Sequence, residues 1–307
     1  MKRREFLTKS VSAGIATTVV PLMFGDLDKL SAKPPANGNY DLAAIRGGSP
    51  EEMFEKAIES LGGYDRFIKP GQSVLIKPNI GWDTPPERAA NTNPDLVGHM
   101  VKRAFEVGAE SVTVFDHTCD QWDRCYRNSG IEAAVRDNGG RIIPGNNERN
   151  YVEVSNPNGK RLKTVKVHEA LHNNDVFINV PVLKHHGSTT VTAAIKNLMG
   201  VIWDRRYYHG NNLSQCIADF LHYRKPDLNI IDGYRMMTQN GPKGVSVNDL
   251  VDLGALIAGT DIVAVDTAAT LFFGSQPEEI SHVRIAEEMG LGTTNLETLS
   301  VNRVRIS

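Results

Sequence analysis

Lysine, asparagine, aspartate and histidine side chains follow four short apolar runs of this sequence, and together they could bind one ligand. They are Lys77 and Asn79 after the first run, Asp116 after the second, Lys184 and His185 after the third, and Asp232 after the fourth. Lysines attract anions, and asparagine and aspartate can fix hydroxyl or amide groups or share a metal. The set therefore predicts a binding site for a small polar, anionic ligand.

A further lysine, Lys196, precedes Asn197 on a helix expected over residues 189–199. Apolar neighbours can bury its aliphatic stem and point its ammonium into a cleft, where burial and nearby Lys184 would lower its pKa. Such a lysine could act as a base, as a Schiff-base nucleophile or as a phosphate clamp. A solvent-facing lysine on an amphipathic helix would show the same spacing.

Four of these residues are expected to carry any catalytic step, namely Lys196, Lys184, His185 and Asp116. His185 and His186 are adjacent, so in an extended loop they point in opposite directions, and we favour His185. The residues expected to bind the ligand are Lys77, Asn79, Asn197, Asp232, Gly241, Lys243 and Gly244. The last three form a turn whose glycines permit close backbone approach to a ligand, although a surface turn has the same composition.

Trp203, Tyr207 and Tyr208 alternate with charged residues and could form a lid over this site. Arginine and tyrosine side chains together suit an anionic or aromatic ligand. A packed surface loop is the alternative interpretation.

His117, Cys119 and Asp120 form a compact cluster beside Asp116 and are the candidates for a metal site. They could bind zinc or iron if a fourth ligand came from elsewhere in the chain. A disulfide between Cys119 and Cys125 would compete with this hypothesis in an oxidising compartment. The chain has only three cysteines, so an intrinsic four-cysteine iron–sulfur cluster is not expected, and the cofactor stays unidentified.

The elements that must position these residues alternate between β-branched strands and amphipathic helices, which is typical of a parallel α/β sheet. We expect strands over 73–77, 111–115, 141–144, 176–180, 228–231 and 299–306, and helices over 49–61, 93–108, 131–138, 213–223, 262–272 and 277–289. The predicted fold is α/β, with a mostly parallel sheet flanked by helices, Rossmann-like or doubly wound. Ligands bind such sheets outside the carboxyl ends of the strands.

The chain is expected to divide into a signal with its linker, residues 1–38, and a single domain over residues 39–307. The turn residues at 156–159 separate two short β-branched runs, so a small β-hairpin is expected as an insertion within 146–170. The oligomeric state stays open.

Arg3 and Arg4, followed by Phe-Leu and a weakly apolar run over residues 11–24, resemble a twin-arginine (Tat) export signal. The run is shorter than the ~20 residues that a membrane span needs. The chain is therefore expected to pass through the Tat translocase into the periplasm. Ala32 follows a poor cleavage sequence, so a cleaved protein and an uncleaved anchor both stay open, and a basic segment before a short buried helix is the alternative.

The composition limits the classes of function. The chain has 307 residues, of which 40% are hydrophobic and 23% charged, so it can bury its own core and is not expected to be disordered. Its net charge of −2 lacks the positive excess of a dedicated nucleic-acid binder, so no nucleic-acid partner is expected.

Three motifs together resemble the bacterial and archaeal family called domain of unknown function 362. They are the Lys-Pro-Asn run at 77–79, the Pro-x-Leu-Lys-x-His run at 181–186 and the Lys-Asn-x-x-Gly run at 196–200. The resemblance covers most of the chain after about Tyr40 and implies a shared fold, without an established reaction. Some relatives carry ferredoxin-like cysteine motifs beside this domain, and this sequence lacks them. The resemblance therefore implies a redox partner only as an open alternative.

The order of strands, polar strand ends and a later histidine-containing segment is also loosely similar to the nickel-pincer lactate racemase family, although the signature residues differ.

Two functions stay open. The first is an exported enzyme, cofactor- or metal-dependent, that acts on a small anionic compound in a lysine-rich cleft. The second is a non-catalytic periplasmic binding or accessory protein that serves a redox or cofactor partner. Catalysis requires at least one strongly shifted pKa, whereas binding does not.

Overall fold

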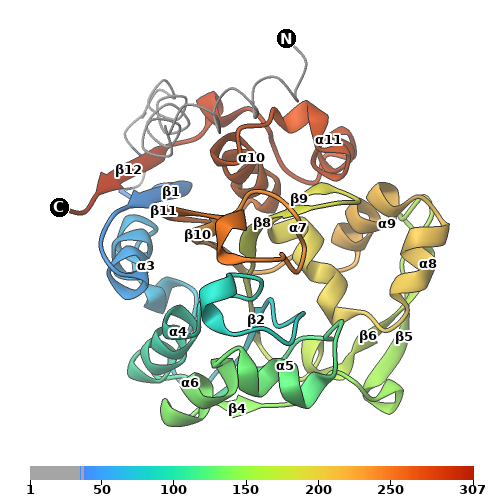
Figure 1. Ribbon diagram of the computed structural model, residues 1–307, viewed down its shortest axis with the longest axis horizontal. Helices are drawn as coiled ribbons and strands as arrows, with labels where there is room; N and C mark the ends of the chain where they lie inside the picture. The colour runs from blue at the N-terminus through green and yellow to red at the C-terminus, as the bar shows by residue number, and fades with distance from the viewer. Residues whose placement is uncertain (1–34, 36–37) are drawn as a thin grey trace.

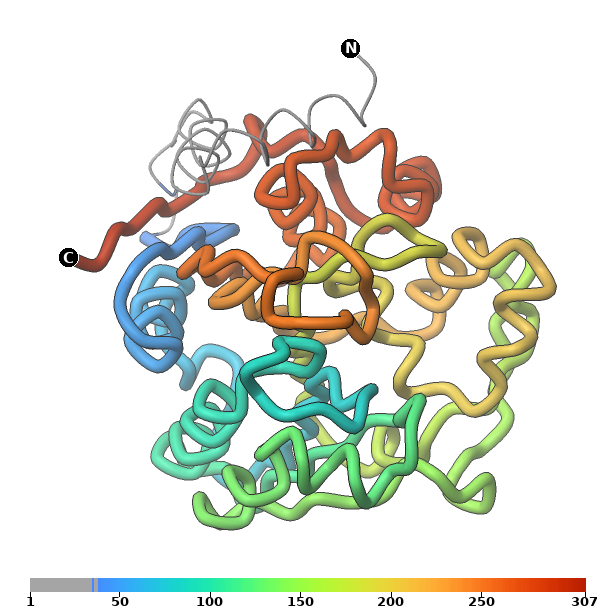
Figure 2. Tube along the Cα trace, in the orientation of Figure 1, coloured from blue at the N-terminus to red at the C-terminus, as the bar shows by residue number. Residues whose placement is uncertain are grey.

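The computed structural model describes residue 35 and residues 38–307. The twin-arginine segment and the apolar run that follows it lie outside the described residues. Figures 1 and 2 show a central sheet with helices packed on its two sides. The expected fold class, a mostly parallel sheet flanked by helices, is confirmed.

The central sheet has the strand order β12-β1-β11-β10-β7-β2-β3-β4, and β8 and β9 join it at β10. Its strands are β1 (Leu42–Arg46), β2 (Ser73–Pro78), β3 (Ser111–Val114), β4 (Arg141–Ile142), β7 (Val176–Val180), β8 (Val182–His186), β9 (Thr190–Thr192), β10 (Leu228–Met237), β11 (Leu250–Gly259) and β12 (Val301–Arg305). Strand β11 is antiparallel to both β10 and β1, and the other pairings along this order are parallel.

Side chains that alternate along the strands pack into two apolar cores, one on each face of the sheet. Val74 and Ile76 of β2 belong to the first core with residues of α3, α4 and α6, whereas Leu75 belongs to the second with residues of α9, α10 and α11. The helices are α3 (Pro50–Ser60), α4 (Pro94–Glu106), α5 (Trp122–Asn128), α6 (Ile131–Asp137), α7 (Ala194–Asn197), α8 (Arg205–Gly210), α9 (Leu213–Asp219), α10 (Ile262–Phe272) and α11 (Ser281–Glu288). Burial on both faces explains the continuous apolar runs of the central strands.

Two helix starts follow from residues that cap the backbone. Ser49 accepts a hydrogen bond from the backbone N–H of Glu52, and the Glu52 carboxylate accepts one from the backbone N–H of Ser49, so α3 begins with a capping box. Asn93 caps α4 by accepting from the backbone N–H of Asp95 at 2.8 Å. Both α3 and α4 have proline in their first turn, where its missing N–H costs no helical hydrogen bond.

The segment that carries Lys184 and Lys196 differs from the prediction. Lys184 lies in strand β8 and not on a loop, because residues 182–186 pair with β10 and with β9. The helix expected over 189–199 is reduced to the four residues of α7 and a 3-10 turn after it, because β-branched residues at 189–192 favour the strand β9. Strand β10 also continues to Met237, so Asp232 lies inside a strand and not at its end.

The expected β-hairpin forms a separate two-stranded sheet at the edge of the molecule (Figure 1). It consists of β5 (Tyr151–Ser155) and β6 (Thr164–His168), which pair antiparallel. Val167 also forms an antiparallel bridge with Ile202, just before α8. The hairpin is therefore held against the segment that leads into α8.

Candidate functional site

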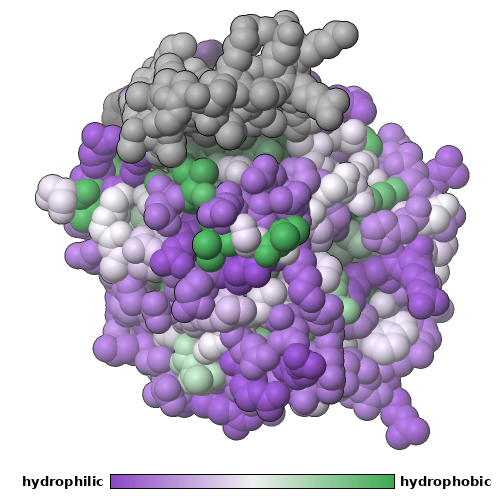
Figure 3. Space-filling view, in the orientation of Figure 1, coloured by the Kyte–Doolittle hydropathy of each residue, from purple (hydrophilic) through white to green (hydrophobic). Residues whose placement is uncertain are grey.

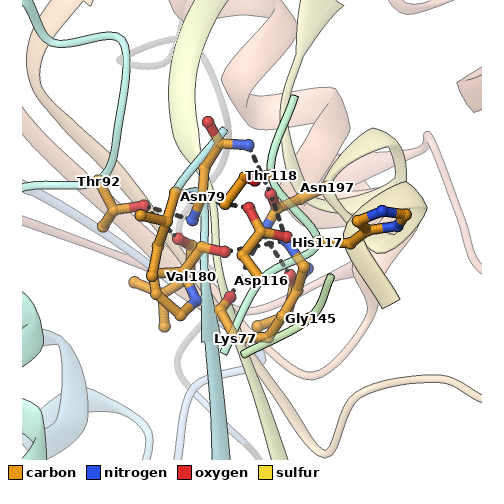
Figure 4. A network of polar contacts seen from close by, with 12 residues as sticks. Lys77, Asn79, Thr92, Asp116, His117, Thr118, Gly145, Val180 and Asn197 are labelled. Carbon is orange, nitrogen blue, oxygen red and sulfur yellow. Dashed lines mark hydrogen bonds and ion pairs between the residues drawn. The ribbon is translucent and has the colours of Figure 1, made fainter. Parts of the chain in front are cut away.

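Lys77 and Asp116 form a buried ion pair at the carboxyl ends of the parallel neighbours β2 and β3 (Figure 4). The Lys77 Nζ lies 2.8 Å from the Asp116 Oδ1, and neither side chain is more than 2% exposed. The second carboxylate oxygen of Asp116 accepts from the backbone N–H of Ile80 at 2.7 Å. Burial lowers the pKa of Lys77 below its ordinary value, and the adjacent Asp116 carboxylate offsets only part of this effect.

Asn197 of α7 connects this ion pair to other buried amides. Its Oδ1 accepts from the Lys77 Nζ at 2.9 Å and from the Asn79 Nδ2 at 3.1 Å. Its Nδ2 donates to the Asn179 Oδ1 at 2.9 Å, and the Asn179 Nδ2 donates to the Asn229 Oδ1 at 3.1 Å. The sequence analysis missed Asn179 and Asn229, although a polar residue inside each apolar run was the signal. The network joins α7 to β2, β7 and β10.

Lys184 reaches the same region from β8. Its Nζ donates to the Asn79 Oδ1 at 2.8 Å and to the backbone carbonyl of Ala90. Both acceptors are uncharged, so neither of these hydrogen bonds pairs the ammonium with a carboxylate. Burial lowers the pKa of Lys184 to about 7.

Lys196 projects from α7, which is held in place by Asp266 of α10. The Asp266 carboxylate accepts from the backbone N–H groups of Ala194 at 2.5 Å and Ile195 at 3.0 Å. The Lys196 Nζ contacts the thioether sulfur of Met199 at 3.1 Å, which is a weak acceptor. Burial lowers the pKa of Lys196 to about 8. Asp266 therefore acts as a cap for α7, and it does not line the cavity described next.

A cavity of about 320 Å³ lies where these side chains meet, and we call it the lysine cavity. It is lined by Asn79, Gly81, Trp82, Asp116, His117, Cys119, Lys184, His186, Thr192, Lys196, Asn197, Met199, Gly200, Arg205, His209 and Pro242. The expected residues Asn79, Asp116, Lys184, Lys196 and Asn197 all line it, and Lys77 lies behind them in contact with Asp116 and Asn197. Hydrophilic residues dominate the face of the molecule shown in Figure 3.

Arg205, the first residue of α8, adds a third basic group to the lysine cavity. Its guanidinium donates to the carbonyls of His117 at 3.0 Å and Thr118 at 2.6 Å, and to the Cys119 sulfur at 3.2 Å. These three bonds fix the guanidinium against the loop after β3. The sequence analysis considered Arg205 only as part of a lid.

The histidines of the lysine cavity are uncharged at neutral pH. Burial lowers the pKa of His186 to about 3, and it also lowers the pKa values of His117 and His209. His186 lines the cavity and His185 does not, because neighbouring residues of β8 point to opposite sides of the strand. His185 instead accepts from the backbone N–H of Gly241 at 3.1 Å. The preference for His185 is therefore corrected to His186 as the histidine that lines the cavity.

Asp232 lies away from the lysine cavity, in a smaller cavity of about 290 Å³ beside the start of α4. Its carboxylate accepts from the backbone N–H groups of Asn93 at 2.8 Å and Tyr234 at 3.0 Å. Burial raises the pKa of Asp232 to about 6. The expectation that Asp232 shares the site with Lys77 is corrected, because β10 continues five residues beyond it.

The turn at 241–244 packs beside the lysine cavity and contributes Pro242 to its lining. A Cβ at Gly241 would lie 1.9 Å from the His185 carbonyl oxygen, so this glycine permits contact with β8 and not with a ligand. The Lys243 Nζ pairs with the Asp120 Oδ2 at 2.5 Å. Gly244 adopts a φ of 72°, which only glycine adopts freely, and it packs on Met237.

The three candidate metal ligands have separate partners. The His117 Nδ1 bonds the carbonyl of Ile202 at 2.8 Å, Asp120 pairs with Lys243, and Cys119 contacts Arg205. No group of three or more histidine, cysteine, aspartate or glutamate side chains suited to a metal occurs in the described part of the chain.

The cysteines are all free. Cys119 is exposed and Cys125 is buried, and no disulfide joins them. Cys216 is buried in the second apolar core.

None of the helices in the described residues is both long enough and apolar enough to span a membrane.

A thylakoid-associated protein of Synechocystis sp. is similar to this chain, with 28% identity over 270 residues, which cover 83% of this chain and 79% of the relative. Among solved structures, the lactate racemase apoprotein from Thermoanaerobacterium thermosaccharolyticum is similar with a TM-score of 0.47 and 11% identity. The similarity covers 80% of this chain and 56% of that one.

The family model for the domain of unknown function 362 matches residues 74–270, which is more than half of the chain. These residues include the Lys-Pro-Asn run, strand β8, helix α7 and Arg205, and so the whole wall of the lysine cavity. The chain belongs to the domain of unknown function 362 family.

Proposed function

We propose that the chain binds a small anionic ligand in the lysine cavity. The observation that carries the proposal is the burial of Lys184 and Lys196 beside one cavity, with no ion pair to a carboxylate for either of them among the described residues. Taking an ammonium out of water is costly unless an opposite charge compensates it. A bound anion would supply that charge, and Arg205 would supply further donors.

The lowered pKa values favour an enzyme over a passive binding protein. A lysine with a pKa of about 7, as for Lys184, can accept or donate a proton near neutral pH. We propose that Lys184 exchanges a proton with the bound anion or with a group attached to it. Lys196 and Arg205 would hold the anion during this step. A non-catalytic binding function remains the alternative, and the absence of turnover with ligands that bind would favour it.

Folding stability should depend on pH in the direction set by these lysines. Both pKa values lie below the value of about 10.4 for an unfolded lysine, so between about pH 7 and pH 10 the unfolded chain binds more protons. The stability contribution of Lys184 and Lys196 therefore rises with pH across this range. A bound anion should oppose this trend, because it favours the charged lysines of the folded state.

Replacing Lys196 with methionine should weaken anion binding and leave the fold intact, because methionine keeps the apolar stem and removes the charge. At a sulfate concentration 100 times the Kd, the wild-type protein should gain about 2.7 kcal/mol of stability. The Lys196→Met variant should gain clearly less. Thermal melts with and without sulfate measure both gains, and sulfate is suitable because its charge stays constant from about pH 6 to pH 9.

Lys102→Met is the matched control, since Lys102 is exposed on α4 and distant from the cavity lining. It should respond to sulfate as the wild type does. The wild-type response should also decrease from about pH 6.5 to pH 9, as Lys184 and Lys196 lose their protons. Equal sulfate responses of wild type and Lys196→Met would contradict the proposal.

We also propose that the protein acts in the periplasm after export by the Tat translocase, on the basis of Arg3, Arg4 and the apolar run that follows. Replacing both arginines with lysine should retain the folded protein in the cytoplasm. Cell fractionation with detection of the protein measures its location. Unchanged periplasmic accumulation of the double variant would rule out this route.

A further inference from the structure

A second cavity adjoins the lysine cavity and has a volume of about 780 Å³. Its lining residues come from the β5–β6 hairpin and from α8 with the residues just before it, and these elements lie on the right of Figure 1. His117 and Arg205 line both cavities. We call the second one the aromatic cavity because Trp203, Tyr207 and Tyr208 also line it.

His117 and Arg205, which line both cavities, are each held by several contacts. The His117 ring stacks on Trp203 with an interplanar angle of 3° and a centroid distance of 5.1 Å. The Trp203 backbone N–H donates to the carbonyl of Lys166 in the hairpin at 2.9 Å. Arg205 is fixed by its bonds to the loop after β3. A ligand that extends past Arg205 would therefore meet a preformed aromatic surface.

The charges in the aromatic cavity largely balance. Lys163, Lys166, Arg206 and the shared Arg205 contribute positive charge, and Glu148, Glu153 and Asp204 contribute negative charge. Lys166 pairs with Glu148 at 2.6 Å. The lysine cavity, in contrast, presents Lys184, Lys196 and Arg205 against Asp116, which is already paired with Lys77. The aromatic cavity thus suits a neutral group and the lysine cavity an anionic group.

We propose that the ligand of the lysine cavity is an aromatic anion, in which a phosphate or carboxylate is joined to a planar ring. The charged group would lie against Lys184 and Lys196, and the ring would lie in the aromatic cavity against Trp203 and Tyr207. Aromatic side chains favour planar rings through stacked and edge-to-face contacts. This inference rests on the proposed function, because it assumes that an anion occupies the lysine cavity.

The test compares the affinities of methyl phosphate and phenyl phosphate, which carry the same charge and differ in the ring. We expect phenyl phosphate to bind about tenfold more tightly, which corresponds to about 1.4 kcal/mol. Trp203→Ala should remove this preference and keep the affinity for methyl phosphate, and Trp203→Phe should restore part of it. Isothermal titration of each of the three proteins with both compounds measures the six affinities.

Because Trp203 also packs on His117 and Tyr151, Tyr207→Ala serves as a second variant. Tyr207 is 40% exposed, so its replacement should leave the fold intact and still reduce the preference for phenyl phosphate. Equal affinities of the two compounds for the wild type would overturn this inference and leave the anion site in place. Binding of neither compound would overturn both proposals. A preference that survives Trp203→Ala and Tyr207→Ala would overturn the placement of the ring.

Discussion

Asp116→Asn should lower the free energy of unfolding by about 3–5 kcal/mol at neutral pH, the cost of breaking a buried ion pair by removing one partner. The substitution keeps the shape of the side chain, so the loss comes from Lys77, whose ammonium would stay buried with only uncharged acceptors, among them the Pro78 carbonyl and Asn197. Urea denaturation followed by fluorescence or circular dichroism measures the change.

Two further measurements separate this charge effect from a general disturbance of the fold. The double variant Lys77→Met/Asp116→Asn should lose less free energy of unfolding than the two single variants lose together, because it leaves no unpaired charge. The loss in Asp116→Asn should also shrink as the pH rises above neutral, because burial lowers the pKa of Lys77 and the neutral amine needs no counter-charge. Additive losses that do not change with pH would contradict the assigned role of the pair.

Gly200→Ala is expected to be the second strongly destabilising substitution. A Cβ at this position would lie 1.8 Å from the Asp116 Oδ1 and 2.6 Å from the Lys77 Nζ, so the ion pair would have to separate. Overpacking of this kind costs about 1–3 kcal/mol, and the strained ion pair adds to it. The variant should also lose its thermal response to sulfate, because Asp116 and Lys77 position Asn197 and the cavity wall.

Gly210→Ala is the control for this prediction. Gly210 ends α8, has no positive φ, and a Cβ there would contact nothing within 4 Å. Its replacement should leave both the midpoint of urea denaturation and the sulfate response near those of the wild type. A Gly200→Ala variant as stable as Gly210→Ala would show that the ion pair can move without cost, contrary to the expected result.

The sequence predicted the elements whose signals are local. The cap residues Ser49 and Asn93 fix where α3 and α4 begin, and the run 262–272 became α10 as expected. The run 182–192 was harder to predict, because its strands depend on pairing with β10 far along the chain. The short helix α7 likewise depends on tertiary contacts and not on its own length.

The residues of the candidate site also differ in whether local sequence signals could predict them. Lys77, Asn79 and Asp116 were predicted together because they follow neighbouring parallel strands, and Lys196 because of its place beside Lys184. Arg205 was not predicted as a site residue, since its bonds reach back 88 residues to His117, and no local pattern encodes such a contact. His185 and His186 were expected to point in opposite directions, but the side that faces the cavity depends on the pairing of β8 with β10 and β9, which no local pattern encodes.

Helix α7 has a consequence for the order in which the chain folds during synthesis. Four residues are too few to persist as a helix alone, and the Asp266 carboxylate that caps α7 is 72 residues beyond Ala194. On the ribosome, Lys196 emerges well before Asp266, so a nascent chain cannot hold this lysine in place. The proposed anion should therefore bind only after α10 has left the exit tunnel, and incomplete chains still on the ribosome should not bind it.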